Sequence, residues 1–106
     1  MPRPRMCRRV GYAPKSNYFK PAGIPMSLLK EVILTIDEFE AIRLKDLEEK
    51  DQEESAKKMG ISQPTFNRLL KIARKKIAEA IVEPKAIKIE GGNYEFVRGG
   101  RRFGQR

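Results

Sequence analysis

The stretch QEESAKKMGISQPTFNRLLK, residues 52–71, decides the expected fold. It predicts two helices joined by a tight turn. Gly60 tolerates the left-handed backbone conformation in which many helices end, and the small Ala56 suits a close crossing of the two helices. Ser62 can cap the second helix, and Pro64 then falls in its first turn, where a missing N–H costs little. We therefore expect a helix–turn–helix in this stretch.

The second helix of this unit has an apolar side and a polar side. Its apolar residues recur at spacings of three and four and form one stripe, namely Phe66, Leu69, Leu70, Ala73, Ile77, Ala80 and Ile81. Basic and amide side chains fall mostly off this stripe, and such side chains can reach base edges and phosphates in a major groove. We expect base contacts from Gln63, Thr65, Asn67 and Arg68, and phosphate contacts from Ser62, Lys71, Lys75 and Lys76. An ordinary amphipathic hairpin with a solvated basic face is the alternative.

Residues 37–81 resemble region four of bacterial sigma factors, which reads the upstream promoter element. The whole chain resembles more closely a family of small, poorly characterised, predicted DNA-binding proteins of bacteria and archaea. The resemblance is carried by RPRMCRRV, FKPAGIP, IDEFEAIRLKD, MGISQPTFNRLL and a final IEGG, and it extends over nearly all 106 residues. It implies a fold and a DNA-binding role, without a target.

The segments on either side of the helical pair have strand patterns. Residues 31–36 are rich in β-branched side chains, and Asp37 is expected to cap a helix with Glu40 as the capping-box partner. Residues 86–90 and 93–97 alternate around Gly91 and Gly92, a pattern typical of a hairpin because both glycines can take positive φ. The predicted fold is mostly α, a three-helix helix–turn–helix core with a short strand before it and a C-terminal β-hairpin.

Four regions follow from this pattern: a basic N-terminal arm and irregular strap (1–30), a DNA-binding domain (31–83), the hairpin (84–97) and a basic Arg/Gly tail (98–106). The expected helical core comprises Phe39, Ile42, Leu47, Ala56, Met59, Phe66, Leu69 and Ala73. An isolated hairpin is marginal in water and needs a partner strand, either residues 31–36 or a second chain. Since one small helix–turn–helix makes few base contacts, we expect a homodimer.

The formal net charge of +9 is unevenly distributed. Residues 1–30 hold seven basic and no acidic side chains, whereas residues 31–54 hold ten acidic and three basic ones. This segregation is expected of a protein that meets phosphates along one face. Arg3, Arg5, Arg8 and Arg9 resemble an arm that enters an A·T-rich minor groove. For this arm and for the basic tail alike, the alternative to nucleic-acid contact is charge that only keeps the protein soluble.

Composition excludes several classes of protein. The chain has no histidine and a single cysteine, Cys7, so zinc fingers and intrachain disulfides are excluded. It has no phosphate-binding glycine loop and no nucleophile–base pair, so we expect no enzyme and no cofactor. The acidic block lacks the ligand spacing of a calcium loop, so no metal is expected. No apolar run approaches the ~20 residues of a membrane span, which favours a cytoplasmic protein without membrane contact.

Three functions are compatible with these features. The sequence favours a sequence-specific double-stranded DNA-binding protein that regulates transcription with its recognition helix in the major groove. The alternatives are an RNA or single-stranded nucleic-acid binder and a module that docks on RNA polymerase or a sigma factor.

Overall fold

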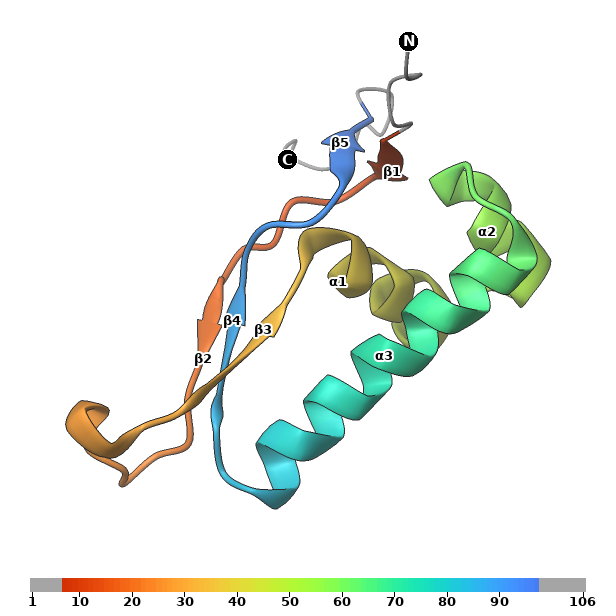
Figure 1. Cartoon of the computed structure of the whole chain (residues 1–106). Coiled ribbons are helices and arrows are strands. Elements are labelled where there is room, and N and C mark those ends of the chain that lie inside the picture. Colours follow the sequence, from red (N-terminus) through yellow and green to blue (C-terminus); the bar gives the residue numbers. More distant parts are fainter. Residues whose placement is uncertain (1–6, 98–106) are drawn as a thin grey trace, which may run out of the picture.

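The computed structural model describes residues 7–97, so Arg3, Arg5 and the predicted tail lie outside the described residues. Within them, three α-helices and five short strands form a small domain. Helices α1 (Ile36–Ile42), α2 (Gln52–Met59) and α3 (Gln63–Val82) lie on one side of a three-stranded sheet, and α3 runs along most of the molecule (Figure 1). None of the helices in this part of the chain is both long and apolar enough to cross a membrane.

The junction between α2 and α3 forms as the local sequence predicts. Helix α2 ends at Gly60, whose backbone is left-handed with φ 71° and ψ 33°. The Ser62 side chain then caps α3 by accepting a hydrogen bond from the Thr65 N–H, and Pro64 lies in the first turn. Ala56 is buried between the two helices. These positions are confirmed because each depends on contacts within a few residues.

Helix α1 continues into a single π-helical turn, η2 (Arg43–Leu47). Leu44 is buried, whereas Leu47, a predicted core residue, is 74% exposed. A π-helical turn holds more residues than an α-helical turn, so it rotates the following side chains off the apolar stripe. The prediction of Leu47 in the core is therefore wrong.

The N-cap of α1 is Thr35 and not Asp37. Thr35 and Glu38 form the capping box: the Thr35 N–H donates to Glu38 Oε1 at 2.9 Å, and the Glu38 N–H donates to Thr35 Oγ1 at 3.4 Å. The helix thus begins directly after the preceding strand, two residues before the predicted cap. Asp37 falls inside the first turn and is buried.

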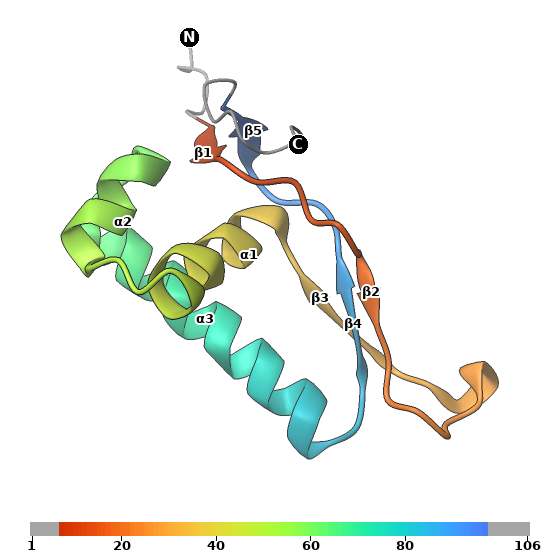
Figure 2. The same cartoon turned by 180° about the vertical axis from the view of Figure 1, so that it is seen from behind.

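The strands form two small sheets. In the larger one, β4 (Ala86–Ile89) lies between β2 (Tyr18–Phe19), which is antiparallel to it, and β3 (Glu31–Leu34), which is parallel to it. The smaller sheet pairs β1 (Arg8–Val10) with β5 (Tyr94–Phe96) in parallel (Figure 2). A short 3-10 helix, η1 (Met26–Leu28), connects β2 to β3.

The predicted C-terminal hairpin is wrong, because β4 and β5 belong to different sheets. Gly91 and Gly92 do take positive φ values of 75° and 106°, but they lead the chain past the N-terminus of α1. The Ile36 N–H donates to the Gly91 carbonyl at 2.9 Å. Both pairings lie within one chain, so the open hairpin that motivated the dimer is absent. The predicted arm and strap also contribute β1 and β2 to the fold.

The core has two parts. Buried side chains from α1 to α3 form the first, namely Ala41, Leu44, Ala56, Met59, Phe66, Leu69 and Leu70. The second joins the strands to α1 and α3 and comprises Val10, Leu34, Ile36, Ala73 and Ile89. Of the predicted helical core, Phe39 and Ile42 are half-buried, and the others except Leu47 are buried. The second part holds α3 from behind and leaves its opposite face to solvent.

Candidate nucleic-acid interface

The outward face of α3 presents a ridge of amide and basic side chains. Gln63, Asn67, Lys71 and Lys75 follow one another at intervals of four residues, so they lie on one side of the helix, with Arg68 beside them. All five are exposed. None of these five side chains makes a hydrogen bond or an ion pair with another of residues 7–97. We call these five residues the α3 ridge.

Two of the other predicted contact residues, Ser62 and Thr65, lie at the flank of this ridge. Ser62 is exposed, but its hydroxyl caps the helix and donates to Thr65 Oγ1 at 2.9 Å. Thr65 is half-buried and lines a hollow of about 340 Å³ between α3, the start of α1 and the segment after β4. Both side chains therefore fix the start of α3, and Arg68 borders the same hollow.

Other cations of α3 are paired with acidic side chains. Arg74 donates to both carboxylate oxygens of Asp46, at 3.1 Å and 2.5 Å. The hydrogen bond from Arg74 lowers the pKa of Asp46 below its ordinary value, and the same bond raises the pKa of Arg74. At the end of the helix, Glu79 accepts from Lys85 at 2.5 Å, which lowers the pKa of Glu79. The Arg74–Asp46 pair lies off the α3 ridge, whereas Glu79 follows Lys75 by four residues on the line of the ridge, and the charge of Lys75 also lowers the pKa of Glu79.

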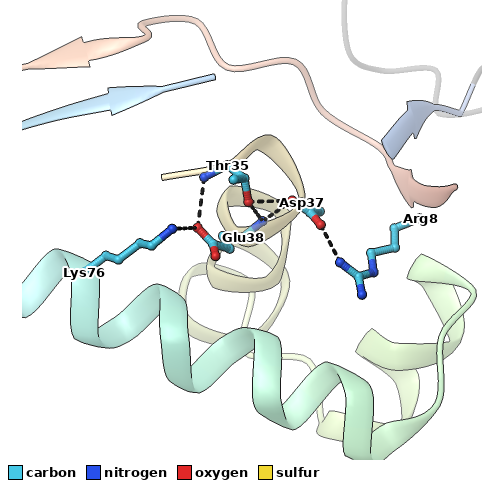
Figure 3. A network of polar contacts seen from close by, with 5 residues as sticks. All are labelled: Arg8, Thr35, Asp37, Glu38 and Lys76. Carbon is cyan, nitrogen blue, oxygen red and sulfur yellow. Dashed lines mark hydrogen bonds and ion pairs between the residues drawn. The ribbon is translucent and has the colours of Figure 1, made fainter. Parts of the chain in front are cut away.

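A second network joins β1, α1 and α3 (Figure 3). Asp37 accepts from Arg8 at 2.7 Å and from the Thr35 hydroxyl at 2.5 Å. Glu38 accepts from Lys76 at 2.8 Å while it completes the capping box. The two carboxylates are only 3% and 8% exposed, so each needs its cation to offset desolvation. Negative charge also suits the first turn of a helix.

This network changes the interpretation of two predicted DNA contacts. Lys76, expected at a phosphate, and Arg8, expected in a minor-groove arm, each neutralise a buried carboxylate inside the fold. We assign both a structural role. Sequence periodicity gave one signal of this for Lys76, which follows Ala73 by three residues and therefore lies close to the apolar stripe.

Arg9 lies in a place that the sequence did not indicate. It is exposed, and its guanidinium group lies over the turn between α2 and α3, where a Cβ on Gly60 would be 3.1 Å from Arg9 Nε. Lys57 and Lys58, in the last turn of α2, are also exposed. Within the described residues these three cations have no acidic partner. They extend the positive surface of the α3 ridge across the turn.

The sequence also gave no indication of a second hollow, of about 430 Å³, which is bordered by Glu40, Arg43 and Tyr12. Its central side chain, Arg43, donates to both oxygens of Glu40 at 2.8 Å, pairs with Glu48 and lies 5.2 Å from the centre of the Tyr12 ring. Burial opposes the charge of Arg43, but the bonds to Glu40 and the nearby carboxylates outweigh it, so its pKa is raised. Gly11 N–H completes the Glu40 interactions at 2.9 Å. The charges and hydrogen-bonding groups around this hollow are therefore already paired with one another.

Metal ligands are not gathered anywhere in residues 7–97: no group of three or more histidine, cysteine, aspartate or glutamate side chains is arranged to hold an ion. The fold and the site define a small mixed domain whose longest helix presents an exposed, unneutralised basic face.

The chain belongs to a family described as "Protein of unknown function DUF134", whose model it matches over residues 1–97. A UPF0251 protein of Thermoanaerobacter pseudethanolicus is 58% identical over 94 residues, which are 89% of this chain and 80% of the relative. One from Caldanaerobacter subterraneus is 59% identical over 95 residues, 90% of this chain and 80% of the relative. One from Desulforudis audaxviator is 57% identical over 97 residues, and the chain spans 63% of that relative and 92% of itself. No solved structure matches the chain.

Proposed function

We propose that this protein binds double-stranded DNA in a sequence-specific manner and regulates transcription. In this proposal α2 and α3 form a helix–turn–helix similar to that of sigma region four. The N-terminal half of α3 enters the major groove. Gln63, Asn67 and Arg68 read base edges, and Lys71 and Lys75 hold phosphates.

The observation that carries the proposal is the division of the basic residues on α3. Arg74 and Lys76 form ion pairs with acidic side chains of η2 and α1, whereas Arg68, Lys71 and Lys75 form none with the described residues. Lys75 has a weaker electrostatic interaction with Glu79, which is itself bonded to Lys85. The acidic residues of the fold therefore neutralise one side of the helix and leave the other positively charged. A surface of this kind attracts phosphates and releases counterions when it binds them.

The turn supports the same proposal by its geometry. The αL conformation at Gly60 and the short link to Ser62 bring α3 across α2 with its first turns exposed. These are the turns whose side chains contact base edges in helix–turn–helix complexes. Arg9, Lys57 and Lys58 lie beside the turn, where side chains of a docked domain meet the DNA backbone.

Selection of bound duplexes from a random pool, with the full chain, tests the proposal. We expect a short motif to be enriched, and Arg68→Ala to lose about 1–3 kcal/mol of discrimination at one position of it. Lys71→Ala should weaken binding to all sequences alike and reduce the salt slope by about one unit. Lys20→Ala is the control, since Lys20 is an exposed lysine at the end of β2, away from α3.

The outcomes distinguish the functions. Equal affinity for single strands and duplexes, with no enriched motif, would overturn sequence-specific duplex binding and favour the single-strand or RNA alternative. An unchanged motif for Arg68→Ala would overturn the assignment of the α3 ridge to base reading. If Lys20→Ala lowered the salt slope as much as Lys71→Ala does, diffuse charge would explain the binding.

One observation favours a second candidate, docking on RNA polymerase or a sigma factor. Leu47 is 74% exposed at the end of the π-helical turn, directly before Glu48 and Glu49. An exposed leucine beside acidic residues suits a basic partner with an apolar pocket. Binding of the protein to polymerase without DNA, abolished by Leu47→Lys and retained by Lys71→Ala, would support this candidate.

A further inference from the structure

A group of large apolar side chains is exposed at the C-terminal end of α3. Ile81 and Val82 occupy the last turn of the helix, and Met26 and Leu28 belong to η1. Their exposed fractions lie between 62% and 76%. We call these four residues the α3-end patch.

The η1 segment and the residues that follow α3 border one hollow. Leu28 and Ile24 line a hollow of about 370 Å³ together with Pro84, which follows the end of α3. The Ala86 N–H donates to the Lys30 carbonyl at 2.8 Å and fixes the two segments in this register. Figure 1 and Figure 2 both show this end of α3 and η1 at the end of the molecule away from α2.

The packing of the domain does not explain this exposure. The apolar stripe of α3 continues to Ile81, but the core covers it only as far as Ala80. Isolated exposed hydrophobic residues are common, whereas four large ones gathered at one end of a small domain, with charged residues between them, are a candidate interaction surface. The rim here consists of Lys30, Glu83 and Lys85.

We propose that a second copy of this chain covers the α3-end patch and that the protein is a two-fold symmetric dimer. In a two-fold contact the same surface faces itself, so its charges must be mixed in sign. The rim meets this requirement. Glu83 pairs with Lys85 of its own chain at 3.2 Å, but its side chain stays 61% exposed and its carboxylate can accept a second cation. The exposed Lys30 forms no ion pair within residues 7–97. Lys30 of one protomer can therefore pair with Glu83 of the partner subunit. A lipid surface or a nucleic acid would instead require a rim of one sign.

The location of the patch also fits the spacing of DNA half-sites, a step that rests on the proposed function. From Asn67 to Val82 α3 advances fifteen residues, or about 22 Å along its axis. If two such helices meet at their C-terminal ends, their reading segments are about 34 Å apart when the helices enclose an angle of about 100°. That separation is one turn of DNA, so both α3 ridges can face the same side of the duplex.

Sedimentation equilibrium of the full chain without DNA tests the dimer. We expect a dimer at micromolar concentration, and Val82→Glu should weaken self-association by at least about tenfold. Leu47→Glu is the matched control, because Leu47 is 74% and Val82 76% exposed, and Leu47 lies in η2, outside the patch. A strict monomer would overturn the proposal. Equal weakening by Leu47→Glu and Val82→Glu would also overturn it, because the contact would then not be specific to this patch.

A charge exchange tests the pairing across the rim. Lys30→Glu and Glu83→Lys should each weaken the dimer, and the double variant should restore it, because the pair is then reversed. Failure of the double variant to recover would overturn the two-fold arrangement. A stable dimer that binds no duplex would overturn the proposed function and leave the dimer intact. A monomer that binds a single half-site would overturn the dimer and leave the proposed DNA binding intact.

Discussion

Replacing Gly92 with alanine should destabilise the protein more than the same replacement at Gly91. Both glycines have positive φ, 75° at Gly91 and 106° at Gly92, so both variants strain the backbone. They differ in the space around them. A Cβ at Gly91 would have no heavy atom within 4 Å, whereas a Cβ at Gly92 would lie 2.5 Å from Asp37 Oδ1 and 2.9 Å from Thr35 Cβ.

These contacts determine the magnitude. Positive φ costs an alanine about 1–2 kcal/mol at either position. At Gly92 the added methyl group must also displace Thr35 or Asp37, and overpacking of this kind adds about 1–3 kcal/mol. Neither neighbour can move freely, because Thr35 caps α1 and donates to Asp37, while Asp37 is also bound to Arg8. Gly92→Ala should therefore lose about 2–5 kcal/mol in total.

Urea denaturation and thermal melting of the two variants measure this difference. A difference of 1 kcal/mol in the free energy of unfolding corresponds to a shift of roughly 4–8 °C in Tm for a domain of this size. Hydrogen exchange adds a local readout, since faster exchange in the Gly92→Ala variant should begin at the first turn of α1. Equal stability of the two variants would refute the close approach of the Gly92 backbone to Thr35 and Asp37, and with it the path of the chain between β4 and β5.

Two further predictions concern the ion pairs. Lys76→Met should lower the free energy of unfolding, measured by urea denaturation, by about 1–3 kcal/mol. The loss is smaller than for a fully buried pair because the Lys76 side chain is 28% exposed. The control variant Lys75→Met should stay within about 0.5 kcal/mol of the parent. Equal losses would contradict the structural role of Lys76. For Asp46, the hydrogen bond from Arg74 lowers the pKa, so the pair stabilises the fold above the ordinary aspartate pKa and loses this contribution as pH falls through the lowered value. Asp46→Asn should lower the free energy of unfolding by at most about 1 kcal/mol at neutral pH. The stabilities of the variant and the parent, measured against pH, should converge in acid. A difference that stays constant at all pH values would show that the contribution is not ionic.

The α2–α3 junction could be predicted from the sequence because its signals are local. Gly60 accepts a left-handed conformation, Ser62 caps the next helix through Thr65, and each effect acts within four residues. The apolar stripe of α3 likewise identified its buried side. Residue type and spacing were sufficient to predict features that depend only on residues of the same helix or turn.

Strand partners could not be predicted in this way. The pair Gly91 and Gly92 is compatible with a hairpin turn, and its φ values are those expected. The decisive contact is that of Gly92 with Thr35 and Asp37, more than fifty residues earlier in the chain. Nothing in the local pattern encodes this proximity, and the same holds for β1, whose buried Val10 pairs with Phe96 of β5.

One boundary, the first turn of α1, determines the surroundings of two predicted phosphate contacts, Lys75 and Lys76. A cap at Asp37 would place Glu38 at the first helical position, where it takes no part in a capping box. The actual cap at Thr35 makes Glu38 the third residue of the helix, buried, with Lys76 as its cation. The neighbouring Lys75 has no carboxylate to meet within hydrogen-bond distance and stays on the exposed ridge. A shift of two residues at the start of α1 therefore decides which of two adjacent lysines is available to a phosphate.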